Sequence, residues 1–118
     1  MTSLIACVST GQGTWVHVYR LIKQENWDKV YIITNEFGSG KFEKGQNTEI
    51  ITVDFNKEIG MLVEEIQAKL QGKITDFEVA VNIISGTGKE HTAIIAALIR
   101  LGLGIRFAIA GEQGITEV

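Results

Sequence analysis

The segment 79–101 carries the residue types best suited to binding a phosphate. An apolar strand pattern at 79–84 is joined to an apolar helix pattern at 90–101 by a short polar loop, which reads Ser85, Gly86, Thr87, Gly88 and Lys89. Glycines let backbone N–H groups approach an anion closely, a helix N-terminus adds partial positive charge, and a lysine adds a full one. This loop, called the glycine loop below, predicts a nucleotide-like ligand.

The familiar nucleotide motifs are incomplete in this chain. A P-loop needs Ser or Thr after its lysine, but Glu90 follows Lys89 and Phe42 follows Lys41. A dinucleotide fingerprint beginning at Gly11 lacks its third glycine, because that position is Val16. The sequence therefore disfavours ATP hydrolysis by a P-loop mechanism and redox chemistry on a dinucleotide.

The composition is typical of one globular domain spanning 1–118, with 45% hydrophobic and 21% charged residues. Because 11 Lys and Arg stand against 14 Asp and Glu, direct DNA binding is not expected. The single cysteine, Cys7, excludes an intramolecular disulfide, and the lack of a His/Cys cluster at ligand spacing argues against structural zinc. No metal and no cofactor are expected. The longest apolar run, 93–99, is too short to span a bilayer, and no basic signal region precedes the first strand. We therefore expect a cytoplasmic protein with no membrane association.

Strand-like apolar runs alternate with helical periodicity, which predicts an α/β fold. We expect a Rossmann-like, three-layer open sheet that is mostly parallel, with strand order 3-2-1-4-5 and a short antiparallel edge strand. The expected strands are 4–8, 29–34, 49–53, 79–84, 104–110 and 115–118. One helix is expected at 15–24, with Thr14 as its N-terminal cap. A second is expected to begin at a cap on Asp54 or Asn56 and to end at Gly72, and a third is expected at 90–101.

In such a sheet, ligands bind beyond the carboxyl ends of the strands, where the winding reverses between the first and fourth strands. The loop 9–14 and the glycine loop both lie at that point. The polar segment 35–47 is expected to be a lid without secondary structure, whose Phe37 and Phe42 could stack on a base. His17 and His91 begin the two helices that face the crevice, where they act as acid and base or simply face solvent.

The helix at 90–101 is apolar on almost every side, unlike the helix before it. One sheet cannot bury all of these faces. We therefore expect a second copy of the chain to cover the helix, giving a two-fold homodimer with the small residues Ala96 and Ala97 at the contact.

The two loops resemble those of CARF domains, the CRISPR-associated Rossmann-like sensors that bind cyclic oligoadenylates as dimers. The resemblance lies in the run 6–11, which reads ACVSTG, and more strongly in the run 82–89, which reads NIISGTGK. It extends over nearly the whole chain in the order of elements. Family members typically carry an S/T-G-G-T-K-like sequence after the fourth strand, whereas this chain has one extra residue before the lysine.

The resemblance implies a dimeric site for a cyclic oligoadenylate, and cyclic tetra-adenylate matches the two-fold symmetry of such a dimer. The protein would act as a sensor or sink for this second messenger in type III CRISPR defence, with Asn35, Glu36 and Phe37 meeting adenine. The full set of expected contacts is Ser9, Thr10, Gly11, Asn35, Glu36, Phe37, Ser85, Gly86, Thr87, Gly88 and Lys89.

Two other functions remain open at this point. Some CARF relatives cleave the ring without a metal, by attack of a ribose 2′-hydroxyl on the neighbouring phosphate. Lys89 with Ser9 or Thr10 would supply the positioning and charge for such a ring nuclease. The third possibility is a non-catalytic assembly module that uses the sheet only for dimerisation.

Overall fold

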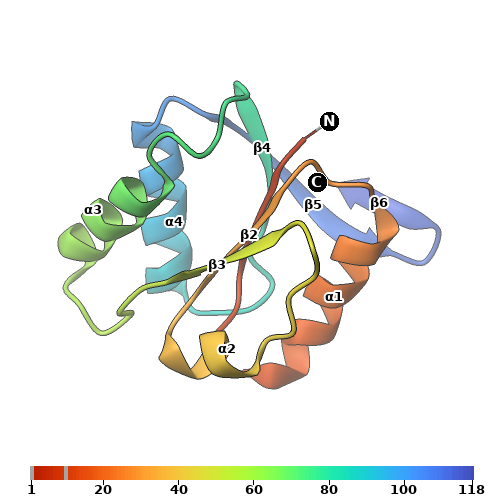
Figure 1. Cartoon of the computed structure of the whole chain (residues 1–118), viewed down its shortest axis with the longest axis horizontal. Coiled ribbons are helices and arrows are strands. Elements are labelled where there is room, and N and C mark those ends of the chain that lie inside the picture. Colours follow the sequence, from red (N-terminus) through yellow and green to blue (C-terminus); the bar gives the residue numbers. More distant parts are fainter. Residues whose placement is uncertain (1, 10) are drawn as a thin grey trace.

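The structure, a computed structural model, describes residues 2–9 and 11–118 and has an α/β architecture of three layers (Figure 1). Within these residues one sheet has the order β3-β2-β1-β4-β5-β6. Its strands are β1 (Leu4–Cys7), β2 (Val30–Thr34), β3 (Thr48–Thr52), β4 (Glu78–Asn82), β5 (Gly104–Gly111) and β6 (Gly114–Glu117). The pairs from β3 to β5 are parallel, and β6 is antiparallel to β5. The predicted fold class, strand order and antiparallel edge strand are confirmed.

Helices cover both faces of this sheet. Figure 1 shows α3 and α4 on one side and α1 on the other, with the short α2 at the lower end. Their bounds are α1 (Trp15–Gln24), α2 (Glu36–Lys41), α3 (Ile59–Leu70) and α4 (Gly88–Arg100), and a 3-10 turn, η1 (Gln12–Thr14), precedes α1. Among the described residues, no helix is long and apolar enough to cross a membrane.

The central strands explain the long apolar runs in the sequence, because β1 and β2 are buried along their whole length. Successive side chains of a strand point to opposite faces of the sheet. Ile5 and Cys7 therefore pack in the core beneath α3 and α4, whereas Leu4 and Ala6 pack beneath α1. The sheet is the middle layer of a core that fixes where every strand ends.

The segment 35–47 differs from the open lid expected from the sequence. Its first half forms α2, which Asn35 caps by accepting a hydrogen bond from the Gly38 N–H group at 3.0 Å. Glycine disfavours helices, so a segment with two glycines, Gly38 and Gly40, was not predicted to form one. Gly38 is present for a packing reason, since a Cβ there would lie 1.8 Å from Thr34 Oγ1. Phe42 is buried and stacked on Tyr19, with ring centroids 4.4 Å apart, so it is not available to a base.

Helix α3 also begins with an unexpected cap. Glu58 accepts hydrogen bonds from the backbone of Gly60 and Met61, whereas Asp54 accepts one from Asn56 in the turn before it. The Glu58 side chain folds over the next turn of the chain to reach these N–H groups. Glutamate is not among the residues usually preferred at this position, which are Ser, Thr, Asp and Asn. The predicted end of the helix is confirmed, because Gly72 follows it with a φ of 80°.

The packing of α3 yields the first prediction. Ile66 is fully buried against the sheet, whereas Met61 on the same helix is 56% exposed. Ile66→Ala should lower the free energy of unfolding by about 2–5 kcal/mol, because it removes buried methyl groups and leaves a cavity. The control Met61→Ala should change it by less than about 0.5 kcal/mol. Urea unfolding followed by circular dichroism measures both, and equal losses would contradict the assigned packing.

Candidate ligand-binding site

The carboxyl ends of β1 and β4 meet as the strand order predicts. The backbone N–H of Ser9 donates to Ser85 Oγ at 3.3 Å, and both residues are buried. This hydrogen bond joins the loops that follow the two strands, which lie 76 positions apart in the sequence. In Figure 1 these strand ends lie at the bottom of the sheet, beside α2. The reversal of winding therefore brings the two predicted loops into contact.

The loop after β1 is held by α1. The Ser9 carbonyl accepts a hydrogen bond from Trp15 Nε1 at 2.9 Å, and Gly11 is exposed beyond it. Thr10 lies outside the described residues. Thr14 does not cap α1 as expected, because it has helical backbone angles within η1 and its hydroxyl donates to the Gly11 carbonyl. A capping side chain normally requires an extended backbone at that position.

Helix α4 begins at Gly88, two residues before the predicted start. Thr87 and Glu90 form a reciprocal capping box at this end. Thr87 Oγ1 accepts from the Glu90 N–H group at 3.4 Å, and Glu90 Oε1 accepts from the Thr87 N–H group at 2.9 Å. The Glu90 carboxylate is therefore buried against the start of its own helix, next to the glycine loop.

Three exposed amides remain beside this cap. The backbone N–H groups of Gly86, Gly88 and Lys89 have no hydrogen-bond acceptor among the described residues. They lie at the positive end of a 13-residue helix. Unpaired amides at a helix N-terminus are the groups that bind an anion. The glycine loop thus has the donors expected of a phosphate site.

The side chain of Lys89 points away from these amides toward another wall. Its Nζ donates to the Phe55 carbonyl at 2.9 Å, on the segment between β3 and α3. The ammonium thereby ties the first turn of α4 to the end of β3. A ligand phosphate at the loop reaches Lys89 only if this hydrogen bond is replaced.

A cavity of about 690 Å³ lies next to the loop, across the carboxyl ends of β1, β2 and β3. Four of the predicted site residues line it: Ser9, Asn35, Glu36 and Phe37. The sequence prediction missed the other lining residues, which are Thr52, Val53, Asp54, Phe55, Asn56, Glu65 and Glu90. None of the residues of the glycine loop lines this cavity. The predicted contacts therefore fall into two groups, one in the glycine loop and one in the neighbouring cavity.

Four carboxylates line this cavity. Glu65 forms ion pairs with Lys57 at 3.3 Å and Lys69 at 3.2 Å. Burial tends to raise the pKa of Glu65, but hydrogen bonds from the Asp54 N–H group and from the two lysines outweigh it and hold this pKa below its usual range. Glu65 therefore stays ionised at neutral pH. With Glu36, Asp54 and Glu90 on the same wall, the cavity offers carboxylate oxygens as hydrogen-bond acceptors.

The region behind Gly86 is tightly packed. Gly86 has a φ of 108°, and a Cβ there would lie 2.8 Å from both Cys7 Sγ and Glu90 Oε1. Burial and the nearby Glu90 charge raise the pKa of Cys7 far above its ordinary value, so this thiol is unreactive at neutral pH. His91 Nε2 lies 2.8 Å from the Ser85 carbonyl, whereas His17 is exposed on α1.

Alanine substitutions at two glycines of the loop should have opposite effects. Gly86→Ala should destabilise the protein by at least about 2 kcal/mol, because a side chain is strained at positive φ and would clash with Cys7. Gly88→Ala should be neutral or stabilising by up to about 1 kcal/mol, since nothing lies within 4 Å of the added Cβ. Urea unfolding of the two variants measures the difference, and equal stability would contradict the loop conformation.

No protein-family model matches this sequence, and no curated protein is significantly similar to it. No family is shown by these comparisons, so function must be inferred from the site.

Proposed function

We propose that this chain binds a cyclic oligoadenylate, with a phosphate against the glycine loop. The observation that carries this proposal is the set of backbone amides of Gly86, Gly88 and Lys89 at the start of α4, which have no acceptor among the described residues. Such amides and the positive end of the helix favour a phosphate oxygen over water. Lys89 and Glu90 in the same turn carry opposite charges, so the amides and the helix end supply the attraction for the phosphate.

The neighbouring cavity suits the nucleoside part of the same ligand. The carboxylates of Glu36 and Asp54 and the side chain of Asn35 offer hydrogen-bond acceptors. Ribose hydroxyls and the adenine amino group are donors, so they match this wall, whereas a second phosphate does not. Phe37 is 38% exposed at the cavity and offers a face on which adenine can stack. The likeness of the two loops to CARF domains narrows this nucleotide-like ligand to a cyclic oligoadenylate.

A homodimer through α4 completes the proposed site. The outward face of α4 carries His91, Thr92, Ile95, Ala96 and Ile99, which line a shallow hollow. Their spacing of three and four residues places them in one stripe along the helix, and Ile99 is 63% exposed. The stripe starts within one turn of the glycine loop. A two-fold axis along it would bring two loops around one ring-shaped ligand, as a sensor or sink in type III CRISPR defence requires.

Binding fits the described residues better than ring cleavage does. Ser9 is buried, and Lys89 Nζ is hydrogen-bonded to the Phe55 carbonyl. Attack by a ribose 2′-hydroxyl needs a group positioned to accept its proton. His91 Nε2, which is next to the loop, is already bonded to the Ser85 carbonyl. We therefore propose a binding protein and treat cleavage as an outcome of the test.

Replacing Gly88 with proline removes one of the proposed donors. Gly88 is the first residue of α4, where proline is well tolerated, and Thr87 before it has φ −109° and ψ 169°, the extended backbone that precedes proline. Cyclic tetra-adenylate should bind the wild type and the control Gly88→Ala alike in isothermal titration calorimetry. Gly88→Pro should bind at least about tenfold more weakly, because a hydrogen bond to a charged group is worth about 1.5–3 kcal/mol.

Two results would contradict this proposal. Absence of binding by the wild type at about 1 mM ligand would leave only the assembly module. Equal affinity of Gly88→Pro and Gly88→Ala would show that the phosphate does not bind at the glycine loop. Chromatography after incubation in EDTA should recover the intact ring, whereas linear products that disappear in Lys89→Ala would assign a ring nuclease instead.

The proposed dimer predicts a change in mass. Ile99→Glu places a charge at the exposed end of the α4 stripe and should convert a dimer into a monomer in sedimentation velocity, with weaker binding of cyclic tetra-adenylate. Met61→Glu, at an equally accessible position on α3, should leave both unchanged. A wild type that sediments as a monomer with and without ligand would contradict the dimer.

A further inference from the structure

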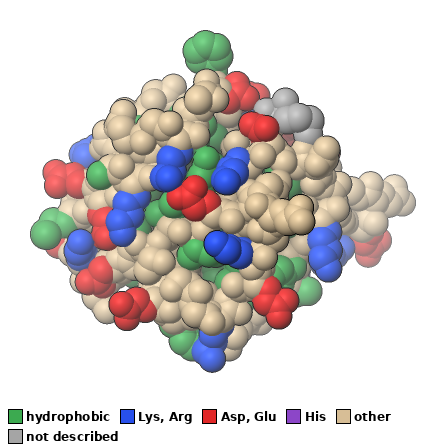
Figure 2. Space-filling model, in the orientation of Figure 1, with side chains coloured by type: hydrophobic (Ala, Val, Ile, Leu, Met, Phe, Trp, Pro, Cys, Tyr) green, Lys and Arg blue, Asp and Glu red, His purple; other side chains and the backbone are tan. Residues whose placement is uncertain are grey.

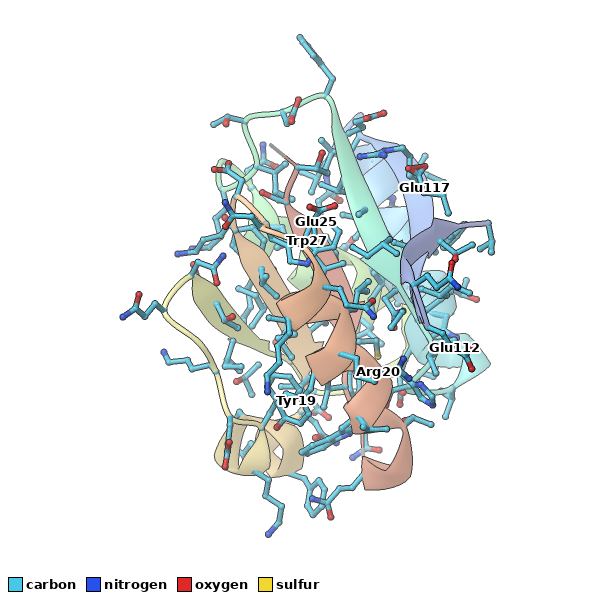
Figure 3. All side chains as sticks on the ribbon, turned by 90° about the vertical axis from the view of Figure 1, so that its right-hand side faces the viewer. Tyr19, Arg20, Glu25, Trp27, Glu112 and Glu117 are labelled. Carbon is cyan, nitrogen blue, oxygen red and sulfur yellow. The ribbon has the colours of Figure 1, made fainter. Side chains whose placement is uncertain are left out.

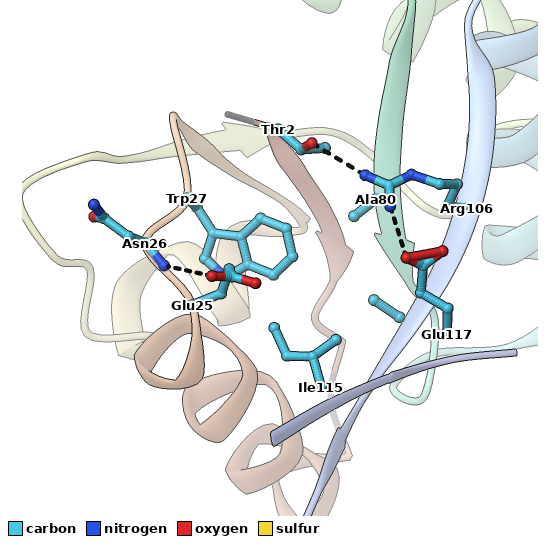
Figure 4. Close-up of a pocket in the computed structure, with 9 residues that line it drawn as sticks. Thr2, Glu25, Asn26, Trp27, Ala80, Arg106, Ile115 and Glu117 are labelled. Atoms are coloured by element: carbon cyan, nitrogen blue, oxygen red, sulfur yellow. Dashed lines mark hydrogen bonds and ion pairs between the residues drawn. The ribbon is translucent and has the colours of Figure 1, made fainter. Parts of the chain in front are cut away.

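A second cavity, of about 190 Å³, lies at the opposite end of the sheet from the glycine loop. The chain leaving α1 lines one side of it, and β4, β5 and β6 line the other (Figure 4). Figure 3 shows this side of the molecule, with Glu25 and Trp27 beyond the end of α1 and Glu117 on β6. The proposed cyclic oligoadenylate site uses none of these residues.

The inner surface of this cavity is apolar and fixed in shape. Ala80 and Ala108, on β4 and β5, are too small to fill the space beneath α1, and Ile115 closes it from β6. Trp27 forms another wall and is only 7% exposed. Its Nε1 donates to the Leu21 carbonyl at 3.0 Å, which locks the orientation of the ring. The cavity therefore exists before any ligand arrives, and one aromatic ring borders it.

Arg106, the one cation among the described lining residues, is already paired with carboxylates. Arg106 forms ion pairs with Glu117 at 2.7 Å and Glu78 at 3.1 Å, and it donates to the hydroxyl of Thr2 at 3.0 Å. Figure 4 shows the contacts to Thr2 and Glu117 on one side of the cavity. Two carboxylates around one guanidinium leave this side with a net negative charge. An anionic ligand would have to displace a carboxylate to reach the arginine.

The opposite rim carries an unmatched negative charge. Glu25 forms no ion pair among the described residues, and its carboxylate accepts only a 3.3 Å hydrogen bond from the Asn26 N–H group. Glu25 is also the C-terminal cap of α1, where the helix adds partial negative charge. Side chain and helix end therefore favour a cation at the same place.

We propose that this cavity binds a small organic cation, a primary amine on an apolar body. The ammonium lies between the Glu25 carboxylate and the ring of Trp27, which attracts a cation to its face. The apolar body packs on Ala80, Ala108 and Ile115. The carboxylates of Glu25, Glu78 and Glu117 disfavour an anion, and a neutral ligand would gain no ion pair with Glu25. This proposal does not depend on the cyclic oligoadenylate site.

Phenethylamine is a suitable probe, because it joins a primary amine to one aromatic ring. In a ¹H–¹⁵N NMR titration, the indole Nε1–H signal of Trp27 should shift and saturate. The indole signal of Trp15, which lies by the loop after β1, should not move. Phenethyl alcohol has nearly the same shape without the charge, and phenylacetate reverses the charge. Both should bind at least about tenfold more weakly than the amine.

Glu25→Gln keeps the size of the side chain and removes its charge. Because Glu25 is exposed, this variant should fold normally and bind phenethylamine at least about tenfold more weakly than the wild type. The control Glu112→Gln changes a charge at the turn between β5 and β6, which Figure 3 shows away from Glu25, and should bind like the wild type. An unmoved Trp27 signal, equal binding of the alcohol, or unchanged affinity in Glu25→Gln would each overturn the proposal.

Discussion

The candidate site depends on the close approach of the glycine loop to the end of β1. Because Gly86 has no side chain, the loop can pass within contact distance of Cys7, and the Ser9 to Ser85 hydrogen bond closes the gap beside it. Any side chain at Gly86 would push the loop outward. The start of α4, its capping box and its free amides all follow from that approach, since the loop delivers the chain to the helix in one fixed direction.

The sequence was sufficient to predict the fold because alternating strands and helices leave few arrangements of a parallel sheet. It also placed Ser9 and Ser85 together, since strand order alone determines which loops meet. The helix α2 was not predictable in the same way. Gly38 is required by the proximity of the Thr34 side chain, four residues earlier, and the direction of that side chain cannot be read from residue types alone. The cap at Glu58 was missed for a related reason. Whether its carboxylate reaches the N–H groups of Gly60 and Met61 depends on the side-chain conformation, which the sequence does not specify.

The carboxylate wall was missed although a signal for it was present. Asp54 and Asn56 directly follow a predicted strand, as Ser9 does, and the rule that ligands bind beyond strand ends applies to them equally. Of the four carboxylates that line the cavity, only Glu36 was among the predicted contacts. Acidic and basic side chains alternate over short distances on the surface (Figure 2). Figure 2 shows acidic and basic side chains interspersed across one face, in keeping with a net charge of −3. Local arrangement, more than overall charge, decides which ligand group each region attracts.

The Glu90 carboxylate serves two parts of the structure at once. It caps α4 through the Thr87 N–H group, and it also borders the cavity at the ends of β1 to β3. A ligand group that donates a hydrogen bond to Glu90 therefore draws on the same oxygens that hold the first turn of α4. Occupancy of the cavity and the order of that turn are thermodynamically linked through this side chain. The outward stripe of α4 begins in the same turn, so the linkage extends from the cavity to the surface that we propose for a second copy.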